Sequence, residues 1–265
     1  MKSFYIVTNE EKDKNLIITN QVKSYLEKQG CKVNATPKDA ECILVLGGDG
    51  TLLQAARDFA SENIPLLGIN LGTLGYLAEV DTDSIPTALE HLVKDEYETE
   101  HRMMINGTVM CKDSETEEFA LNDIVLVRSG PLRVIHYHIY VNGQFLKGYS
   151  ADGIIVSTPT GSTGYNMSAG GPIVEPKAEL MVLTPICPHT LNTRSIVLAP
   201  KDVIEIEICP GKDNKIQDVE VNFDGSHSKR LTTGDRIKIT RSEKQTKILK
   251  LSKLSFLEVL HRKMN

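Results

Sequence analysis

The chain has 265 residues, 40% of them hydrophobic and 25% charged, which is ordinary for a globular protein and long enough for one large domain or two smaller ones. A net charge of −5 provides no overall basic field, which argues against nucleic acid as a partner. No apolar run approaches the ~20 residues of a membrane span, no signal-type run follows Met1 and no CxxC pair occurs, so we expect a cytoplasmic protein with no membrane partner, disulfide framework or cysteine zinc site.

The first hundred residues carry alternating strand and helix patterns. Apolar runs predict strands at 4–8, 31–35, 42–46 and 66–69, and periodic apolar positions predict helices at 15–29, 52–60 and 84–94. Ser84 can cap the last of these helices, with Pro86 in its first turn. This alternation favours a parallel, doubly wound sheet. We therefore expect residues 1–100 to form an α/β domain.

Strand patterns dominate after residue 100. We expect strands at 104–111, 119–127, 134–141, 154–157, 203–209, 219–223, 236–240 and 246–251. The third of these runs into Asn142-Gly143, the strongest short hairpin signal. Residues 101–251 are thus predicted to form a β-rich C-terminal domain. Ser255 can cap a last short helix, and we expect the segment 252–265 to pack back on the N-terminal domain.

The most informative motif is Gly47-Gly48-Asp49-Gly50-Thr51, directly behind the apolar run 42–46. Such a strand is buried on both faces, and ligands bind beyond the carboxyl ends of strands of this kind. Glycines let bare backbone approach an anion, and the N-terminus of the following helix aims N–H groups at a phosphate. Asp49 would repel phosphates unless a metal or a basic group offsets its charge. It is better interpreted as acting on a group beside the phosphates, such as a hydroxyl that awaits transfer of a phosphoryl group.

A second glycine-rich turn, residues 70–77, follows the expected strand at 66–69. Two turns at neighbouring strand ends make one crevice, although tight turns that simply require glycine are the alternative. Asn122-Asp123 are poor strand formers inside the expected strand 119–127. They indicate a ligand contact or a bulge, or else a turn where the strand starts.

A third segment, residues 157–168, is dense in hydroxyls, small residues and glycine. It offers many neutral donors and acceptors, which suit a sugar and an amide better than a bare polyphosphate. A P-loop is excluded, because no Gly-Lys-Ser/Thr follows the glycines. His136 and His138 share one strand face without a third ligand in view, so we interpret them as surface histidines and expect no metal site built from protein ligands.

Together these motifs resemble those of the NAD kinase family. GGDGT, NLGTLGYL, the LNDIVL pair, DGIIVSTPTGSTGY…SAGGPIV and TPICPHTLNTRS occur in the family's order over residues 42 to about 198. GGDGT alone also resembles loops of lipid kinases and phosphofructokinases, whereas STPTGSTGY joined to the rest is specific. The resemblance implies transfer of a phosphoryl group from ATP, or from polyphosphate in some members, to the 2′-hydroxyl of the adenosine ribose of NAD, giving NADP.

The resemblance also implies a divalent cation, magnesium or else manganese, and a homodimer or homotetramer. It makes residues 1–100 a nucleotide-binding domain and residues 101–251 an NAD-binding domain. Asp49 falls on the catalytic base, and the phosphate-binding positions are Gly47, Gly48, Gly50 and Thr51. The substrate-binding positions are Asp49, Gly50, Tyr76, Asn122, Asp123, Asp152, Thr160, Thr163, Gly164, Tyr165 and Ser168.

Several positions depart from the family pattern. Ser150 stands where many members have an arginine, Gly164 replaces an alanine, and Ser226 stands where many members have glutamine. Arg133 and Lys147 are candidates to replace the missing phosphate partner, or are solvated surface charges. The sequence leaves open the choice between ATP and polyphosphate, the use of NADH and feedback by NADP.

Two rival functions predict different features. A GGDGT kinase that acts on a lipid or a sugar has no need of the segment 157–168. A dinucleotide sensor without activity would tolerate loss of the acid at position 49, and that acid is present.

Overall fold

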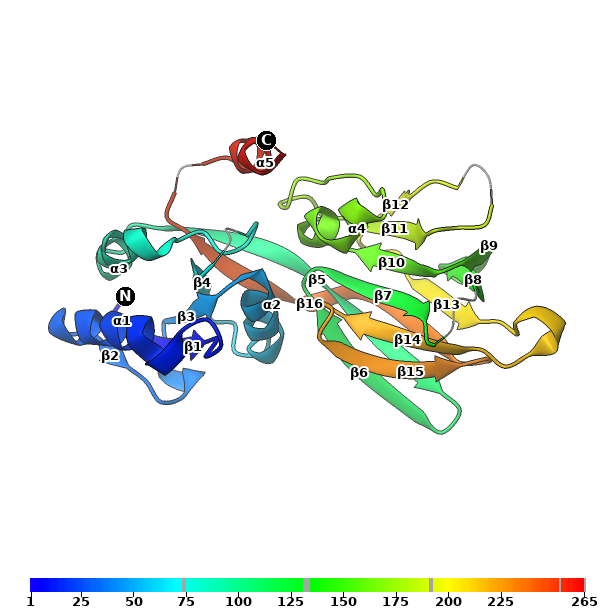
Figure 1. Cartoon of the computed structure of the whole chain (residues 1–265), viewed down its shortest axis with the longest axis horizontal. Helices are drawn as coiled ribbons and strands as arrows, with labels where there is room; N and C mark the ends of the chain where they lie inside the picture. Colours follow the sequence, from blue (N-terminus) through cyan, green and yellow to red (C-terminus); the bar gives the residue numbers. More distant parts are fainter. Residues whose placement is uncertain (73–74, 131–133, 191–192, 253, 265) are drawn as a thin grey trace. The chain divides into compact units, whose positions relative to one another are not determined.

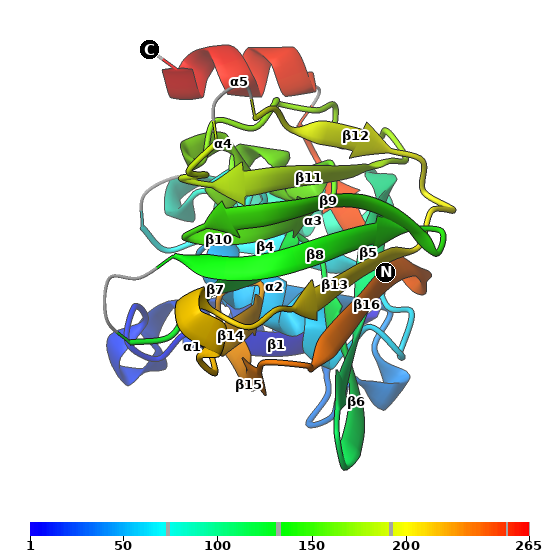
Figure 2. The same cartoon turned by 90° about the vertical axis from the view of Figure 1, so that its right-hand side faces the viewer.

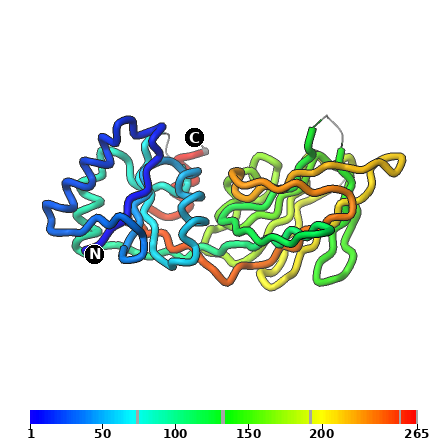
Figure 3. Tube along the Cα trace, turned by 90° about the horizontal axis from the view of Figure 1, so that it is seen from below, coloured from blue at the N-terminus to red at the C-terminus, as the bar shows by residue number. Residues whose placement is uncertain are grey.

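The computed structural model describes residues 1–72, 75–130, 134–190, 193–252 and 254–264 (Figure 1). The chain divides into two compact units, one formed by Met1–Arg102 with Lys244–Asn265 and the other by Met103–Glu243. It passes between them within strands β5 (Glu98–Cys111) and β16 (Arg236–Lys250), which can be followed along the tube in Figure 3. None of the helices in the described part of the chain is long and apolar enough to cross a bilayer.

The first unit contains a parallel sheet with helices on both faces. Its main elements are β1 (Ser3–Thr8), α1 (Ile17–Lys28), β2 (Lys32–Val33), β3 (Cys42–Gly47), α2 (Asp49–Asp58), β4 (Leu66–Asn70), α3 (Ile85–Val93), the end of β16 and α5 (Phe256–Met264). The strand order is β2-β1-β3-β4-β16, and all neighbours are parallel. Strands β3 and β4 are buried throughout, as expected of central strands covered on both sides.

The two faces of this sheet are covered by different helices. Leu67 and Ile69 of β4 share one core cluster with residues of α1 and α3. Gly68, between them, faces α2, because a Cβ there would lie 2.6 Å from Cδ1 of Leu52. The predicted doubly wound sheet is confirmed. Since β1, β3 and β4 run in the same direction, the segments that follow Thr8, Gly47 and Asn70 meet at one edge of the sheet.

The second unit is a sandwich of two mainly antiparallel sheets. Its elements are β5 and β6 (Ser114–Ala120), β7 (Asp123–Arg128), β8 (Ile135–Val141), β9 (Gln144–Ala151), β10 (Gly153–Ser157), α4 (Tyr165–Ser168), β11 (Met181–Ile186), β12 (Ile196–Leu198), β13 (Ile204–Ile208), β14 (Asp218–Phe223), β15 (His227–Thr232) and the start of β16. One sheet has the order β16-β13-β8-β9, with β5 and β6 beside β16, and the other β12-β11-β10-β7-β14-β15 (Figure 2).

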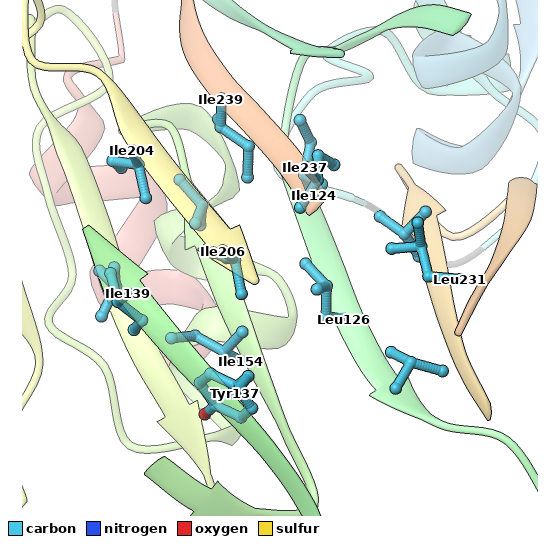
Figure 4. Packing of buried hydrophobic residues seen from close by; sticks show 14 of the residues in the cluster. Ile124, Leu126, Tyr137, Ile139, Ile154, Ile204, Ile206, Leu231, Ile237 and Ile239 are labelled. Carbon is cyan, nitrogen blue, oxygen red and sulfur yellow. The ribbon is translucent and has the colours of Figure 1, made fainter. Parts of the chain in front are cut away.

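The core of this unit lies between its two sheets (Figure 4). Isoleucines of β13 and β16 face apolar side chains of β7, β10 and β15 across the sandwich. Tyr137 of β8 is buried there, and its hydroxyl donates to the carbonyl of Gly153 over 2.9 Å, so its polar atom stays paired. The predicted β-rich C-terminal half is confirmed.

One predicted turn forms as expected. Asn142 and Gly143 both have positive φ, 52° and 76°, and join β8 to β9 as a tight hairpin. The helix expected at 256–264 is α5, Phe256–Met264.

Other predicted elements were wrong in extent. The single strand at 119–127 is two strands, β6 and β7, and the two strands expected at 236–240 and 246–251 are one, β16. The strand at 31–35 shrinks to β2, and β9, β11, β12 and β15 lack a prediction. Ser84 makes no capping bond with its side chain, because the turn starts earlier and Asp81 accepts the N–H of Ser84 over 2.8 Å.

Candidate active site

Asp49 is the first residue of helix α2. The helix was predicted from residue 52 but begins three residues earlier, because Gly48, with φ −130°, is the extended residue that precedes it. A carboxylate in the first turn of a helix faces the positive end of the helix dipole. The buried strand β3 thus delivers Asp49 to the edge of the sheet at a fixed position.

The carboxylate of Asp49 is held by the second glycine-rich turn. Its Oδ2 accepts the N–H of Tyr76 over 2.7 Å, and its Oδ1 accepts the N–H groups of Leu77 and Ala78, each over 3.1 Å. Three backbone donors fix the orientation of a short side chain more firmly than any single contact. The two turns therefore meet, as expected of loops at the ends of adjacent parallel strands.

Two glycines of these turns are required by close packing, one against the Asp49 carboxylate and one against Thr51. A Cβ on Gly75 would lie 1.8 Å from Oδ1 of Asp49, and one on Gly47 would lie 2.2 Å from Oγ1 of Thr51. The Thr51 hydroxyl in turn accepts the N–H of Gly48 over 3.4 Å. A Cβ on Gly50 would meet nothing within 4 Å, so packing does not explain that glycine.

Asn122 and Asp123 lie at the break between β6 and β7. The break is made by Asp224, whose carboxylate accepts the N–H groups of Leu121, Asn122 and Asp123 over 2.9, 2.7 and 3.2 Å. Asp224 itself has φ 49°. These N–H groups are directed to a side chain instead of to a neighbouring strand, which ends β6 and starts β7. The sequence left open a ligand contact, a bulge or a turn at Asn122-Asp123. The structure has a turn there, at the start of β7.

Asp123 is buried at this turn. Burial, and then the nearby carboxylate of Asp224, raise the pKa of Asp123 to about 7. Its neighbour Asn122 has a buried amide oxygen, Oδ1, with no hydrogen-bond partner among the described residues. Buried polar atoms are almost always paired, so this one marks a place for a ligand or water.

The segment 157–168 packs on the same turn. It contains the end of β10, a 3-10 turn (Thr160–Thr163) and α4. The hydroxyl of Thr158 donates to the carbonyl of Leu121 over 2.6 Å, and the N–H of Thr158 donates to the carbonyl of Asn122 over 2.8 Å. A Cβ on Gly161 would lie 2.2 Å from that same carbonyl oxygen, so only glycine allows this approach.

Several predicted ligand positions gather here within the second unit. A Cβ on Gly164 would lie 3.5 Å from Nδ2 of Asn122 and 3.8 Å from Oδ2 of Asp123. The hydroxyl Oγ1 of Thr160 is a second buried polar atom without a partner among the described residues. Thr163 donates to the carbonyl of Thr160 over 3.4 Å. Tyr165 is 46% exposed and Ser168 is also exposed.

Asp152 has a neighbour that the sequence did not predict. Nε of Arg128, at the end of β7, lies 3.5 Å from Oδ1 of Asp152. Ser150, at the position of the family's arginine, contacts Nδ1 of His136 over 2.8 Å instead. Arg128 therefore places a guanidinium group near Asp152, whereas Ser150 has none to offer. The position of Arg128 directly after the apolar run 124–127, as the last residue of β7, is the only signal in the sequence.

The remaining predicted positions have mixed outcomes. Arg133 lies outside the described residues. Nζ of Lys147 lies over the ring of Tyr149, 5.1 Å from its centroid. Tyr76 is placed by its N–H bond to Asp49, and Nζ of Lys263 in α5 lies 5.2 Å from its ring centroid. Across the described ranges, no group of three or more His, Cys, Asp or Glu side chains is arranged to hold a metal ion.

Comparisons with known proteins agree with this geometry. The family model of the ATP-NAD kinase N-terminal domain matches residues 34–97, and that of the ATP-NAD kinase C-terminal domain matches residues 121–251. The NAD kinase of Lachnoclostridium phytofermentans is 45% identical over 99% of both chains. The chain belongs to the NAD kinase family. The NAD kinase of Agathobacter rectalis is 46% identical, over 100% of this chain and 99% of that one.

Solved structures of NAD kinases have the same fold. An NAD kinase from Archaeoglobus fulgidus in complex with ATP has a TM-score of 0.80 at 26% identity, over 99% of this chain and 98% of that one. Yeast NADH kinase complexed with NADH has a TM-score of 0.81 at 25% identity, over 98% and 86%. The family, the fold class and the kinase activity predicted from the sequence are confirmed, and the lipid or sugar kinase alternative is wrong.

Proposed function

We propose that this NAD kinase transfers the terminal phosphoryl group of ATP to the 2′-hydroxyl of the adenosine ribose of NAD, with Asp49 as general base. The observation that carries the proposal is the setting of the Asp49 carboxylate. It stands at the end of a buried strand, in the first turn of α2, and three backbone N–H groups fix its direction. A positioned base with this geometry accepts a proton without rearranging first.

The hydrogen bonds leave the carboxylate with free capacity. Oδ2 of Asp49 accepts one N–H and Oδ1 accepts two, so a lone pair of Oδ2 remains for a hydroxyl. In the proposed step the 2′-oxygen forms a bond to the terminal phosphorus of ATP, and the bond from that phosphorus to the bridging oxygen breaks. ADP leaves with that electron pair, and the hydroxyl proton passes to Asp49.

The donor phosphates require positive charge and N–H donors. We propose that Gly47, Gly48, Gly50 and Thr51 bind them, because these residues form the turn before α2 and its first turn. Magnesium, or manganese in its place, enters as part of the ATP complex. Such an ion would take most of its ligands from the phosphates and water, and it would neutralise part of their charge.

We propose that the turn at Asn122-Asp123 binds the adenosine part of NAD. The unpaired Oδ1 of Asn122 accepts a ligand N–H or O–H, and the unpaired hydroxyl of Thr160 has a free proton to donate. With a pKa of about 7, Asp123 can accept a hydrogen bond when ionised and donate one when protonated. The other proposed NAD contacts are Tyr76, Arg133, Asp152, Thr163, Gly164, Tyr165 and Ser168.

Further proposals follow from the family resemblance. The enzyme is a cytoplasmic homodimer or homotetramer, and polyphosphate is an alternative donor to be tested beside ATP. Its domains are a nucleotide-binding domain at 1–100, with the C-terminal segment 252–265 packed on it, and an NAD-binding domain at 101–251. The placement of residues 244–265 with the first unit, and the contact of Lys263 with Tyr76, support this arrangement.

The test measures NADP formed from NAD, ATP and magnesium with an NADP-specific coupled dehydrogenase. Asp49→Asn should bind NAD with nearly unchanged affinity by calorimetry but lose a factor of about 10²–10⁴ in turnover. Asp58→Asn is the matched control, because Asp58 ends the same helix and bonds only with Gln54 in the described structure. Phosphorus NMR of the product identifies the modified hydroxyl. Wild-type turnover in Asp49→Asn would refute the base assignment.

A further inference from the structure

Lys12 lies over both glycine-rich turns, although it belongs to none of the motifs. Its Nζ is 2.8 Å from the position of a Cβ on Gly48, in the first turn, and 3.4 Å from that of a Cβ on Gly72, in the second. Both positions lie beyond the carboxyl ends of β3 and β4. The ammonium group therefore occupies the edge of the sheet where Asp49 stands.

The fold brings Lys12 there through the third neighbouring strand. Strand β1 pairs in parallel with β3, so the segment after Thr8 reaches the same edge as Gly47. The N–H of Asn9 donates to the carbonyl of Leu46 over 2.8 Å, and its side-chain amide donates to Oγ1 of Thr51 over 3.4 Å. The segment that carries Lys12 is thus bound to the first glycine-rich turn.

Hydrogen bonds fix the backbone on both sides of Lys12. Its own N–H donates to the carbonyl of Asn9 over 3.1 Å and to Oδ1 of Asn9 over 3.2 Å. The next residue, Asp13, is buried, and its carboxylate accepts the N–H groups of Ile18 and Thr19 over 3.0 and 2.8 Å at the start of α1. The position of Lys12 is therefore a consequence of the fold, and only its side chain is free to adjust.

The ammonium group of Lys12 has no competing partner in the described part of the chain, where it forms neither an ion pair nor a side-chain hydrogen bond. The glycine turn needs such a cation, because Asp49 adds a negative charge beside the place proposed for an anionic donor. Phosphoryl transfer relies on positioning and on neutralising phosphate charge. A lysine serves as a compact point charge for phosphates.

We propose that Lys12 binds the phosphoanhydride chain of the phosphoryl donor, an inference that rests on the proposed donor site at Gly47–Thr51. ATP and inorganic polyphosphate present the same chain, so the chemistry that Lys12 recognises is shared by both. The absence of a side chain at Gly48 and Gly72 lets the ammonium lie against both turns. In the proposed complex this cation and the N–H groups at the start of α2 bind the same phosphate chain.

The test compares Lys12→Met, which keeps most of the aliphatic stem, with Lys12→Arg, which keeps the charge. Lys14→Met is the matched control, because Lys14 is two residues away and lies more than 4 Å from a Cβ at either glycine. Initial rates are measured with ATP varied, with polyphosphate varied and with NAD varied. Inorganic tripolyphosphate serves as a competitive probe of the donor site, and calorimetry reports NAD binding.

Lys12→Met should raise the KM for the donor about tenfold or more and weaken inhibition by tripolyphosphate to a similar degree, as expected for the loss of one charged hydrogen bond. The KM for NAD and its affinity should stay within about twofold. Lys12→Arg should recover most of the loss, and Lys14→Met should match the wild type. Circular dichroism melting confirms that each variant is folded.

An unchanged donor KM and unchanged tripolyphosphate inhibition in Lys12→Met would overturn the proposal, and so would an effect confined to NAD. A rise in KM for either donor supports it. The outcome is independent of the test of Asp49, because Asp49→Asn addresses turnover while Lys12→Met addresses donor binding. An inactive Asp49→Asn together with a normal Lys12→Met would retain the proposed base and reject only the role of Lys12.

Discussion

Gly75→Ala tests whether the second glycine-rich turn positions the proposed base. The added methyl carbon would lie 1.8 Å from Oδ1 of Asp49 and 2.1 Å from its Cγ, whereas real Cβ contacts essentially never fall below 3.0 Å. The predicted effect is a steric collision, because the methyl group and the carboxylate cannot occupy the same space. Either the carboxylate or the turn must therefore move by about 1 Å or more.

Both possible movements break the bonds from Tyr76, Leu77 and Ala78 to the carboxylate. A misplacement of about 1 Å at a reacting group costs on the order of 10²-fold in rate. Hydrogen bonds to charged groups contribute roughly 1.5–3 kcal/mol each, and partial relaxation retains some of them. We expect turnover to fall about 10²-fold and the free energy of unfolding to fall by about 2 kcal/mol.

The assay combines coupled NADP formation with unfolding in urea. A double-mutant cycle with Asp49→Ala isolates the collision between the new methyl group and the carboxylate. In the Asp49→Ala background that carboxylate is absent, so the methyl group of Gly75→Ala no longer meets it. Gly75→Ala should therefore destabilise the wild type clearly and the Asp49→Ala variant only slightly. Equal loss of stability in both backgrounds, or wild-type turnover in Gly75→Ala, would show that this turn does not position Asp49.

Two further predictions concern the turn at Asn122-Asp123. Because the pKa of Asp123 is raised to about 7 in the folded state from 3.8, its contribution to stability is fully present below about pH 4 and is lost as pH rises to about 7. Asp123→Asn should remove this pH dependence, so the variant should be more stable than the wild type by a few kcal/mol between pH 5 and 8. Urea unfolding at several pH values measures this difference. Free energies of unfolding that change with pH in the same way in both proteins would contradict the prediction. Asp224→Ala leaves three N–H groups without their acceptor and should lower the free energy of unfolding by about 3 kcal/mol and weaken NAD binding. Asp224→Asn keeps an acceptor oxygen, and asparagine tolerates the φ of 49°, so this variant should lose less stability than Asp224→Ala. Equal losses of stability in the two variants would show that the side chain of residue 224 does not hold these N–H groups.

Short-range patterns in the sequence were sufficient for much of the fold and for part of the site. The apolar runs of β3 and β4 and the turns behind them are local, because a strand buried on both faces is continuously apolar. Asn142-Gly143 specifies its own turn through positive φ. Asp49 stands out for the same reason, as an acid among glycines directly behind a buried strand.

What the sequence could not specify depends on residues that are distant along the chain. Asp224 splits the expected strand 119–127 by accepting N–H groups about a hundred positions away, which no local pattern contains. The three N–H bonds to Asp49, the guanidinium of Arg128 beside Asp152, and the ammonium of Lys12 over two glycine turns likewise follow from strand order. Propensity and periodicity act over a few residues, whereas parallel pairing brings strand ends together from separate segments. The sequence determined the chemical groups and the strands that carry them, and the tertiary structure decided which of those groups meet.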